Sequence, residues 1–231
     1  MFLFIIADIR GWAMSKEEIM KNVQDQLYWD SRVDASDISV EVKGDKVTLF
    51  GSVSDYFGKK VAQKDAYNVP GVTSVRNELI VHFRPGLELP SDKEISSRVR
   101  DILLWNPSIE AAHINIEVQK GSVTISGTVD AYWKRHLAED LTCKIKGVAK
   151  IINELAVVPA NNLSDQAIAE NIIAAFNRDR NITVDTVDIK VEKGKVTVRG
   201  SVPTWAGFHS ILDVIRHTPG VIDIIDFLRF G

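Results

Sequence analysis

Aromatic side chains stand at three equivalent points of this sequence, and at two of them basic side chains follow closely. The nine residues concerned, called here the basic–aromatic set, are Tyr56, Phe57, Lys59, Lys60, Tyr132, Trp133, Lys134, Arg135 and Trp205. Aromatic rings beside cations suit a lipid interface, where the ring enters the headgroup region and the cation meets phosphate. The same rings could instead pack between a helix and a sheet, or between repeats, with the cations in solvent. Trp29 and Trp105 allow the same two interpretations.

The basic–aromatic set is therefore a candidate site for anionic phospholipid or for a partner protein. A helix that binds a membrane surface needs a strongly basic polar face. Here Asp65, Glu139 and Asp140 dilute the positive charge of the segments that follow the rings. We expect any lipid contact to be weak and sensitive to salt.

Residues that catalyse reactions or bind metals are present, but they form no recognised motif. The five histidines include no pair at metal-ligand spacing with a second histidine or cysteine. Cys143 has no motif around it, and a reactive thiolate needs an activating environment. Neither a Gly-x-Ser-x-Gly elbow nor a phosphate-binding Gly-rich loop occurs. The sequence predicts no enzyme, no metal site and no cofactor.

The elements that position these residues come in three copies. The segment Val47–Val53 recurs as Val123–Val129 and again as Val196–Val202, so that its glycines lie 76 and 73 residues apart. A second glycine follows each of them by 20 residues, within a Gly-Val pair. A period of this size indicates a small domain present three times.

The first copy predicts the order helix, strand, strand, helix, strand. Ser15 and Glu18 form a capping box before a helix that ends near Trp29-Asp30. Residues 38–42 and 47–53 alternate as a hairpin, Tyr56–Asn68 is a helix capped by Asp55, and residues 73–82 form a last strand. The second helix connects parallel strands, so each repeat should be an α+β unit with a three-stranded mixed sheet and both helices on one face.

The other copies follow the same plan. Their second helices are expected at Ala131–Lys146 and Thr204–His217. We expect domains at residues 14–84, 91–159 and 163–231, after an N-terminal extension of residues 1–13. Domains this small bury little surface alone, so they should pack on one another. The recurring glycine of the middle strand should either clear a helix or permit a bulge. The third copy has diverged at Arg178 and Phe208, as a terminal cap of the array would.

Composition limits the function further. The 231 residues carry a net charge of −3, which argues against broad nucleic-acid binding. No run approaches the ~20 apolar residues of a membrane span. Residues 1–7 are apolar but lack the pattern of a signal peptide, so they are expected to be a short strand or a disordered tail. A cytoplasmic location is expected, with the periplasm as the alternative. With one cysteine, no intramolecular disulfide can form.

The repeats resemble a known family. The resemblance rests on Leu103–Ile109, Ile114–Val118, Gly121–Val129 and Gly147-Val148, with matching patterns in the other two copies. Together these are similar to BON domains (bacterial OsmY and nodulation), in an OsmY-like tandem of three. The resemblance implies a bacterial, mostly non-enzymatic protein that associates with phospholipid or envelope components, often under osmotic stress. Many members carry a signal peptide or lipid anchor; this chain looks more like the three-repeat cytoplasmic members.

Two functions from different classes remain open. The first is a non-catalytic module that binds anionic phospholipid or an envelope protein. The second is a cytoplasmic, chaperone-like stress protein whose repeats self-associate or hold a client protein. Exposed basic–aromatic patches would favour the first, and an apolar patch without a basic rim the second. Cation sensing through backbone carbonyls and carboxylates is a third possibility.

Overall fold

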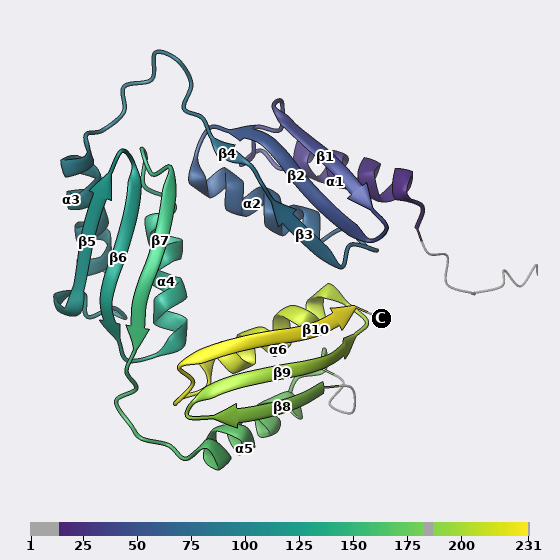
Figure 1. Ribbon diagram of the computed structural model, residues 1–231, viewed down its shortest axis with the longest axis vertical. Coiled ribbons are helices and arrows are strands. Elements are labelled where there is room, and N and C mark those ends of the chain that lie inside the picture. The colour runs from purple at the N-terminus through teal and green to yellow at the C-terminus, as the bar shows by residue number, and fades with distance from the viewer. Residues whose placement is uncertain (1–13, 183–186, 231) are drawn as a thin grey trace, which may run out of the picture.

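The computed structural model describes residues 14–182 and 187–230, so the expected extension of residues 1–13 lies outside the described residues. Three similar units follow one another along the chain (Figure 1). The first repeat contains α1 (Lys16–Trp29), β1 (Ile38–Lys43), β2 (Lys46–Val53), α2 (Tyr56–Tyr67), β3 (Ser74–Asn77) and β4 (Ile80–Val81). The second contains α3 (Asp92–Leu104), a short 3-10 turn (Ala111–His113), β5 (Ile114–Gln119), β6 (Ser122–Val129), α4 (Tyr132–Thr142) and β7 (Lys150–Val157). The third contains α5 (Asp165–Phe176), β8 (Val187–Glu192), β9 (Lys195–Val202), α6 (Trp205–His217) and β10 (Asp223–Phe230).

Each repeat forms its own mixed sheet, which confirms the expected α+β fold. The first two strands pair antiparallel, and the middle strand pairs in parallel with the last. Both helices of a repeat cover the same face of its sheet (Figure 1). The alternation seen in the sequence produces this arrangement, since Val47, Leu49 and Val53 point inward from β2 and are buried.

The expected helix caps are present. Ser15 and Glu18 form a complete capping box, and Ser91 and Glu94 form another. The first turns of α3 and α5 also hold the hairpins, because Asp92 accepts hydrogen bonds from the backbone N–H groups of Lys120 and Gly121, and Asp165 does the same in the third repeat. A carboxylate at a helix N-terminus thus stabilises both the helix and the adjacent turn.

The recurring glycine is required by a close approach of two backbone segments. Gly51 has a φ of +108°, and a Cβ there would lie 2.0 Å from the carbonyl oxygen of Asp37. That oxygen accepts a hydrogen bond of 3.1 Å from the N–H of Ser52. Gly127 repeats this geometry against His113. The obstacle is therefore the carbonyl of the segment that leads into the first strand, and the strand register passes this point without an extra residue. The expectation that the glycine clears a helix or permits a bulge is wrong.

Two expected boundaries differ from the structure. The second helix of the second repeat ends at Thr142 instead of Lys146, because the chain turns at Cys143 and continues through Gly147 at a φ of +92°. The last strand of the first repeat is interrupted between β3 and β4. There the side chain of Asn77 accepts a hydrogen bond of 3.2 Å from the N–H of Leu79, but Asn153 accepts the equivalent bond from Leu155 within the continuous β7, so this bond alone does not interrupt the strand.

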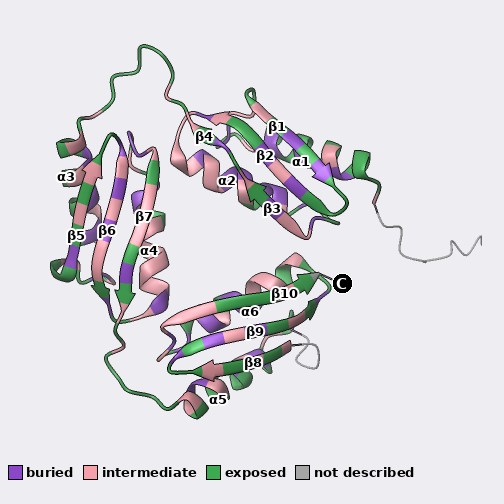
Figure 2. Ribbon diagram, in the orientation of Figure 1, coloured by how far each residue is buried: buried purple, intermediate pink, exposed green. Residues whose placement is uncertain are grey.

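The repeats pack on one another, as their small size leads one to expect. Each has its own cluster of buried apolar residues (Figure 2). Tyr132 belongs to the second repeat but packs in the core cluster of the third. Tyr56 belongs to the first repeat and packs against the cluster of the second. Aromatic rings thus extend the core of one repeat into the next.

A test of the glycine geometry compares Gly51→Ala with Gly44→Ala. Both positions have positive φ, but a Cβ at Gly44 would meet nothing within 4 Å. We expect Gly51→Ala to lower the unfolding free energy by about 3 kcal/mol, because strain and a backbone clash add up. Gly44→Ala should lower it by ~1 kcal/mol. Urea denaturation measures both, and equal effects would contradict the assigned role of Gly51.

Candidate functional site

The second helices of the three repeats, α2, α4 and α6, all lie on the inner side of the molecule (Figure 1). The basic–aromatic set occupies the first turns of these helices. The sequence pattern therefore marks the region where the three repeats meet. What each side chain does there depends on its contacts.

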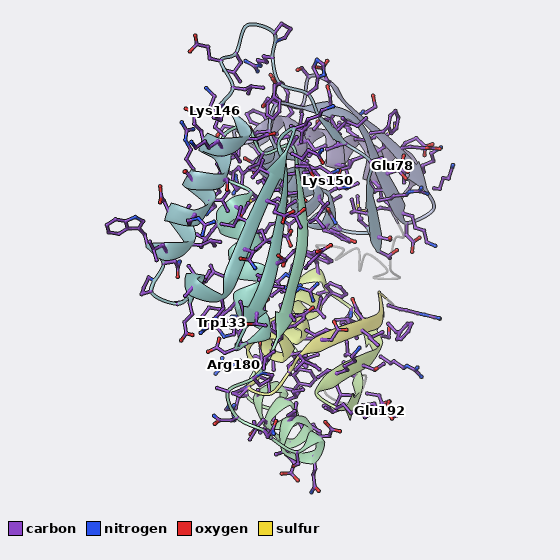
Figure 3. The ribbon with its side chains drawn as sticks, turned by 60° about the vertical axis from the view of Figure 1, so that its left-hand side comes forward. Glu78, Trp133, Lys146, Lys150, Arg180 and Glu192 are labelled. Atoms are coloured by element: carbon purple, nitrogen blue, oxygen red, sulfur yellow. The ribbon has the colours of Figure 1, made fainter. Side chains whose placement is uncertain are left out.

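Most of the aromatic rings make contacts between repeats. Tyr132 is only 9% exposed. Trp205 of the third repeat stacks on Tyr67 of the first, with ring centroids 4.1 Å apart and planes 6° apart. Trp133 stacks on His217 at 6.0 Å, where the second repeat faces the third (Figure 3). Phe57 packs against the core of its own repeat. These rings bury surface that single repeats would leave in water.

The basic members of the set are also engaged inside the chain. The Lys60 ammonium lies 3.0 Å from Glu139 and 2.7 Å from Asp140 of the second repeat. Burial lowers its pKa, but the hydrogen bond to Asp140 and the charge of Glu139 outweigh this, and the pKa rises above its ordinary value. Lys59 donates to the carbonyl of Leu79 at 2.7 Å. Its pKa is lowered by burial and by the nearby charge of Lys150.

In the second repeat the cations make short-range contacts. Lys134 pairs with Asp130 at 2.7 Å, and its ammonium lies 5.8 Å from the centre of the Trp133 ring. Arg135 donates to the carbonyl of Asn153 at 3.3 Å. Some members of the basic–aromatic set thus make contacts between repeats, and others hold the second helix against its own repeat. Whether its members also bind a lipid or a partner stays a prediction.

A central cleft of about 730 Å³ opens between the three second helices. Its lining includes Lys64 and Tyr67 of α2, Lys144 beyond α4, and Trp205, Phe208 and Arg216 of α6. Two potentially reactive groups line it as well. Burial raises the pKa of the Cys143 thiol, and burial lowers the pKa of His209. The thiol donates to the carbonyl of Asp140 at 3.2 Å, and the His209 ring lies edge-to-face with Trp205, so within the described residues no observed contact joins this thiol to a base that would activate it.

A pair of carboxyl groups lies nearby in the first repeat. Asp65 on α2 is 2% exposed, and its pKa is raised to about 6 by burial and by the adjacent charge of Asp30. Asp30 binds Arg32, whose hydrogen bonds hold the pKa of Asp30 well below its usual range. Two neighbouring carboxyls with separated pKa values resemble an acid–base pair. Asp65, however, is not among the residues that line the central cleft, so a substrate there would not reach it.

Metal ligands are not gathered at any point within the described residues. There, no group of three or more His, Cys, Asp or Glu side chains could hold an ion. His136 and His209 occupy equivalent positions in two repeats but face different neighbours. His136 contacts Tyr132 at 5.1 Å and His209 contacts Trp205 at 4.2 Å, in both cases with an edge-to-face geometry.

Two tryptophans at equivalent positions project from the surface. Trp29 ends α1 and is 80% exposed, and Trp105 follows α3 and is 83% exposed. Each has an exposed apolar neighbour, Tyr28 and Leu104 respectively. The sequence left open whether these rings pack inside or face solvent. In the structure they face solvent, unlike most rings of the basic–aromatic set.

The structure also shows a basic–aromatic surface that the sequence analysis missed. Arg199, Phe227 and Arg229 line an open hollow of about 570 Å³ on the outer face of the third sheet. The Arg199 guanidinium lies 5.2 Å from the centre of the Phe227 ring. Aligning the three repeats on their glycines and following the outward positions of each strand would have found this cluster, because the other two copies lack it.

The buried carboxyl of Asp65 predicts a pH dependence of stability. The folded state keeps the Asp65 proton up to about pH 6, whereas the unfolded chain loses it near 3.8, so folding weakens as the pH rises between these values. Asp65→Asn removes this loss, so its stability relative to the wild type should rise from about pH 4 to about pH 6 and reach a gain of ~2 kcal/mol. Asp30 acts in the opposite direction, but only below its ordinary pKa. Thermal melts across this range measure the effect, and a difference between the variant and the wild type that does not change with pH would contradict it.

The contact of Lys60 predicts how the first two repeats separate. Lys60→Met keeps the apolar stem but leaves Glu139 and Asp140 without their cation, and should lower the unfolding free energy by ~1 kcal/mol. Small-angle scattering should also show a larger radius of gyration. Lys43→Met is the control, because its partner Glu41 lies on the same strand and both are exposed. Equal behaviour of the two variants would contradict a role of Lys60 between repeats.

Comparison with known proteins places the chain in a family. The model of the BON domain matches residues 15–82, 91–159 and 164–231. Over 150 residues the chain is 31% identical to "Osmotically-inducible protein Y" of Escherichia coli (strain K12), which covers 63% of this chain and 74% of that protein. It is 27% identical over 121 residues to an "Uncharacterized protein in gshII 5'region" of Anaplasma centrale, covering 50% of this chain and 80% of that protein.

Among solved structures, CdsD, a structural protein of the type III secretion system of Chlamydia trachomatis, matches 92% of this chain and 92% of its own at 12% identity. The TM-score of 0.26 is too low to assign a shared overall arrangement. Within the described residues, none of the helices has both the length and the apolar character needed to cross a membrane. The matched segments include all three copies of the repeated strand and the glycine that it requires. The chain therefore belongs to the BON domain family and carries the domain three times.

Proposed function

We propose that this protein is a non-catalytic binding protein that associates with the surface of anionic phospholipid membranes in the response to osmotic stress. The association with osmotic stress is supported by the similarity to a relative named as osmotically inducible. The observation that carries the membrane proposal is the exposure of Trp29 and Trp105 at equivalent positions of two domains.

An exposed indole is suited to a membrane interface. Its ring gains free energy when it leaves water, while its N–H can remain near the polar headgroups. At 80% and 83% exposure, Trp29 and Trp105 receive little cover from the rest of the described chain. Tyr28 lies edge-to-face with Trp29 at 5.9 Å and is itself 77% exposed. Together these rings form an apolar projection larger than a single scattered surface residue.

The geometry gives no support to catalysis. Asp65 is buried away from the central cleft, and burial suppresses ionisation of both Cys143 and His209. The central cleft is lined by rings and charges that already contact one another across the repeats. We therefore infer that the family's scaffold is used here for binding.

The alternative is a chaperone-like protein that holds a client or associates with itself. The same exposed rings would then contact protein instead of lipid, and the absence of vesicle binding would favour that function. The cytoplasm remains the expected compartment and the periplasm the alternative. Fractionation of the source cell tests the compartment.

The membrane proposal predicts the behaviour of Trp29→Ser combined with Trp105→Ser. We expect vesicle affinity to fall about tenfold or more, because two interfacial rings are lost. Flotation at low salt with vesicles of phosphatidylcholine and phosphatidylglycerol measures the affinity. Leu87→Ser combined with Leu89→Ser is the matched control, since these linker side chains are also exposed, at 45% and 44%. If the wild type does not float with such vesicles, the lipid proposal is wrong.

A further inference from the structure

The outer face of the third sheet differs from those of its two sister domains. Helices α5 and α6 cover one face of this sheet, and the other face is open (Figure 1). Much of the later part of β10 is exposed, at residues 225–227 and at Arg229 (Figure 2). Phe227 is 52% exposed and Ile225, two residues earlier on the same strand, is 42% exposed. Exposure of these two apolar side chains to water does not contribute to the stability of the folded chain.

Two arginines flank the exposed phenylalanine. Strand pairing places Phe227 beside Arg199 and Arg229 beside Ser201. The guanidinium of Arg199 lies over the Phe227 ring, 5.2 Å from its centre. Together with Gly200, these four residues line the hollow of about 570 Å³. Two planar donors and a hydroxyl thus border an open depression that has an aromatic ring in it.

Neither of these arginines forms an ion pair with another described residue. Other cations on the same face are paired, Lys190 with Glu192 at 2.8 Å and Lys195 with Asp223 at 3.7 Å. No carboxylate of the described residues lies within ion-pair distance of either Arg199 or Arg229. Asp188 is beside Arg199 in the strand register and offsets part of its charge. One full positive charge therefore remains on this part of the face.

The fold does not require these side chains. The positions of Arg199, Phe227 and Arg229 correspond to those of Phe50, Glu78 and Ile80 in the first repeat and of Ser126, Glu154 and Ala156 in the second. The parallel register is the same in all three repeats, although the last strand of the first is interrupted around Glu78, and the basic pair around a ring occurs only in the third. Because the other two domains fold without this cluster, its side chains are available for binding.

We infer that this face, formed by Arg199, Ser201, Phe227 and Arg229, binds the phosphate headgroups of anionic phospholipid. A guanidinium donates two parallel hydrogen bonds to phosphate oxygens, so a pair of arginines recognises phosphate by geometry as well as by charge. The Phe227 ring enters the headgroup layer between them. An open, shallow depression fits a flat bilayer surface better than it fits a small ligand, which needs an enclosing pocket.

The inference rests on the proposed function and assigns to the third domain a role of its own. The third repeat has Asn177 and Arg178 where the others have the exposed Tyr28-Trp29 and Leu104-Trp105 pairs. The first two domains therefore supply interfacial rings at helix ends. The third supplies guanidinium groups on its sheet. The two contacts can be tested separately because they share no residue.

The test uses the full chain and two kinds of vesicle, pure phosphatidylcholine and phosphatidylcholine mixed with phosphatidylglycerol. Arg199→Gln combined with Arg229→Gln should lower affinity for the anionic vesicles about thirtyfold, since each basic residue near such a surface contributes about a factor of five. Lys43→Gln combined with Arg76→Gln is the control, because it changes the net charge equally at exposed strand positions of the first repeat. This control should lower affinity by less than about threefold.

The sister domains supply a gain-of-function variant. Ser126→Arg, Glu154→Phe and Ala156→Arg transfer the cluster to the second domain, and should raise the affinity for anionic vesicles about tenfold or more. This variant keeps the test decisive even if the glutamine variant folds poorly, which thermal melts would show. Binding of the folded glutamine variant within about threefold of the wild type would overturn the inference and leave the proposed function standing. Equal affinity of the wild type for both vesicle types would also overturn it. Failure of the wild type to bind any vesicle would overturn both.

Discussion

The structure depends on one constraint: each repeat is too small to cover its own aromatic residues. A domain of this size buries only ~60% of the surface of its unfolded chain. The three repeats meet this limit by sharing rings. Tyr132 of the second repeat is buried in the core of the third, and Tyr56 of the first packs against the core of the second. Trp205 then returns from the third repeat to stack on Tyr67 of the first. The contacts thus link all three repeats to one another.

The residues that determine the fold of each repeat could be predicted from the sequence, because each acts on residues close to it in the chain. A capping box acts within four residues, and the Ser15–Glu18 pair formed as expected. The alternation of Val47, Leu49 and Val53 specified which side of a strand faces the helices. The recurring glycine also indicated a backbone requirement. Its cause is a carbonyl oxygen just before the first strand of the repeat, and not a helix. Such signals depend on neighbours along the chain or on one hairpin partner.

The surfaces were harder to predict because they depend on how whole repeats are placed. Trp133 and Trp105 look alike in the sequence, each an aromatic residue near a helix end. Trp133 lies against His217 of the next repeat, while Trp105 is 83% exposed. No local pattern distinguishes the two, since the difference arises from the position of another domain. The cluster around Phe227 went unnoticed for a related reason: its members come from two strands that only the parallel register brings together.

The stacking of Trp205 on Tyr67 has a consequence for synthesis of the chain. Tyr67 leaves the ribosome well before its partner is translated, at ~5–20 residues per second. In that interval the first two repeats can fold, but the flank of α2 that the third repeat will cover is still open to solvent. Nascent chains therefore pass through a stage, lasting on the order of ten seconds, in which an aromatic surface is available to other molecules. Folding of the last repeat covers this surface and ends that stage.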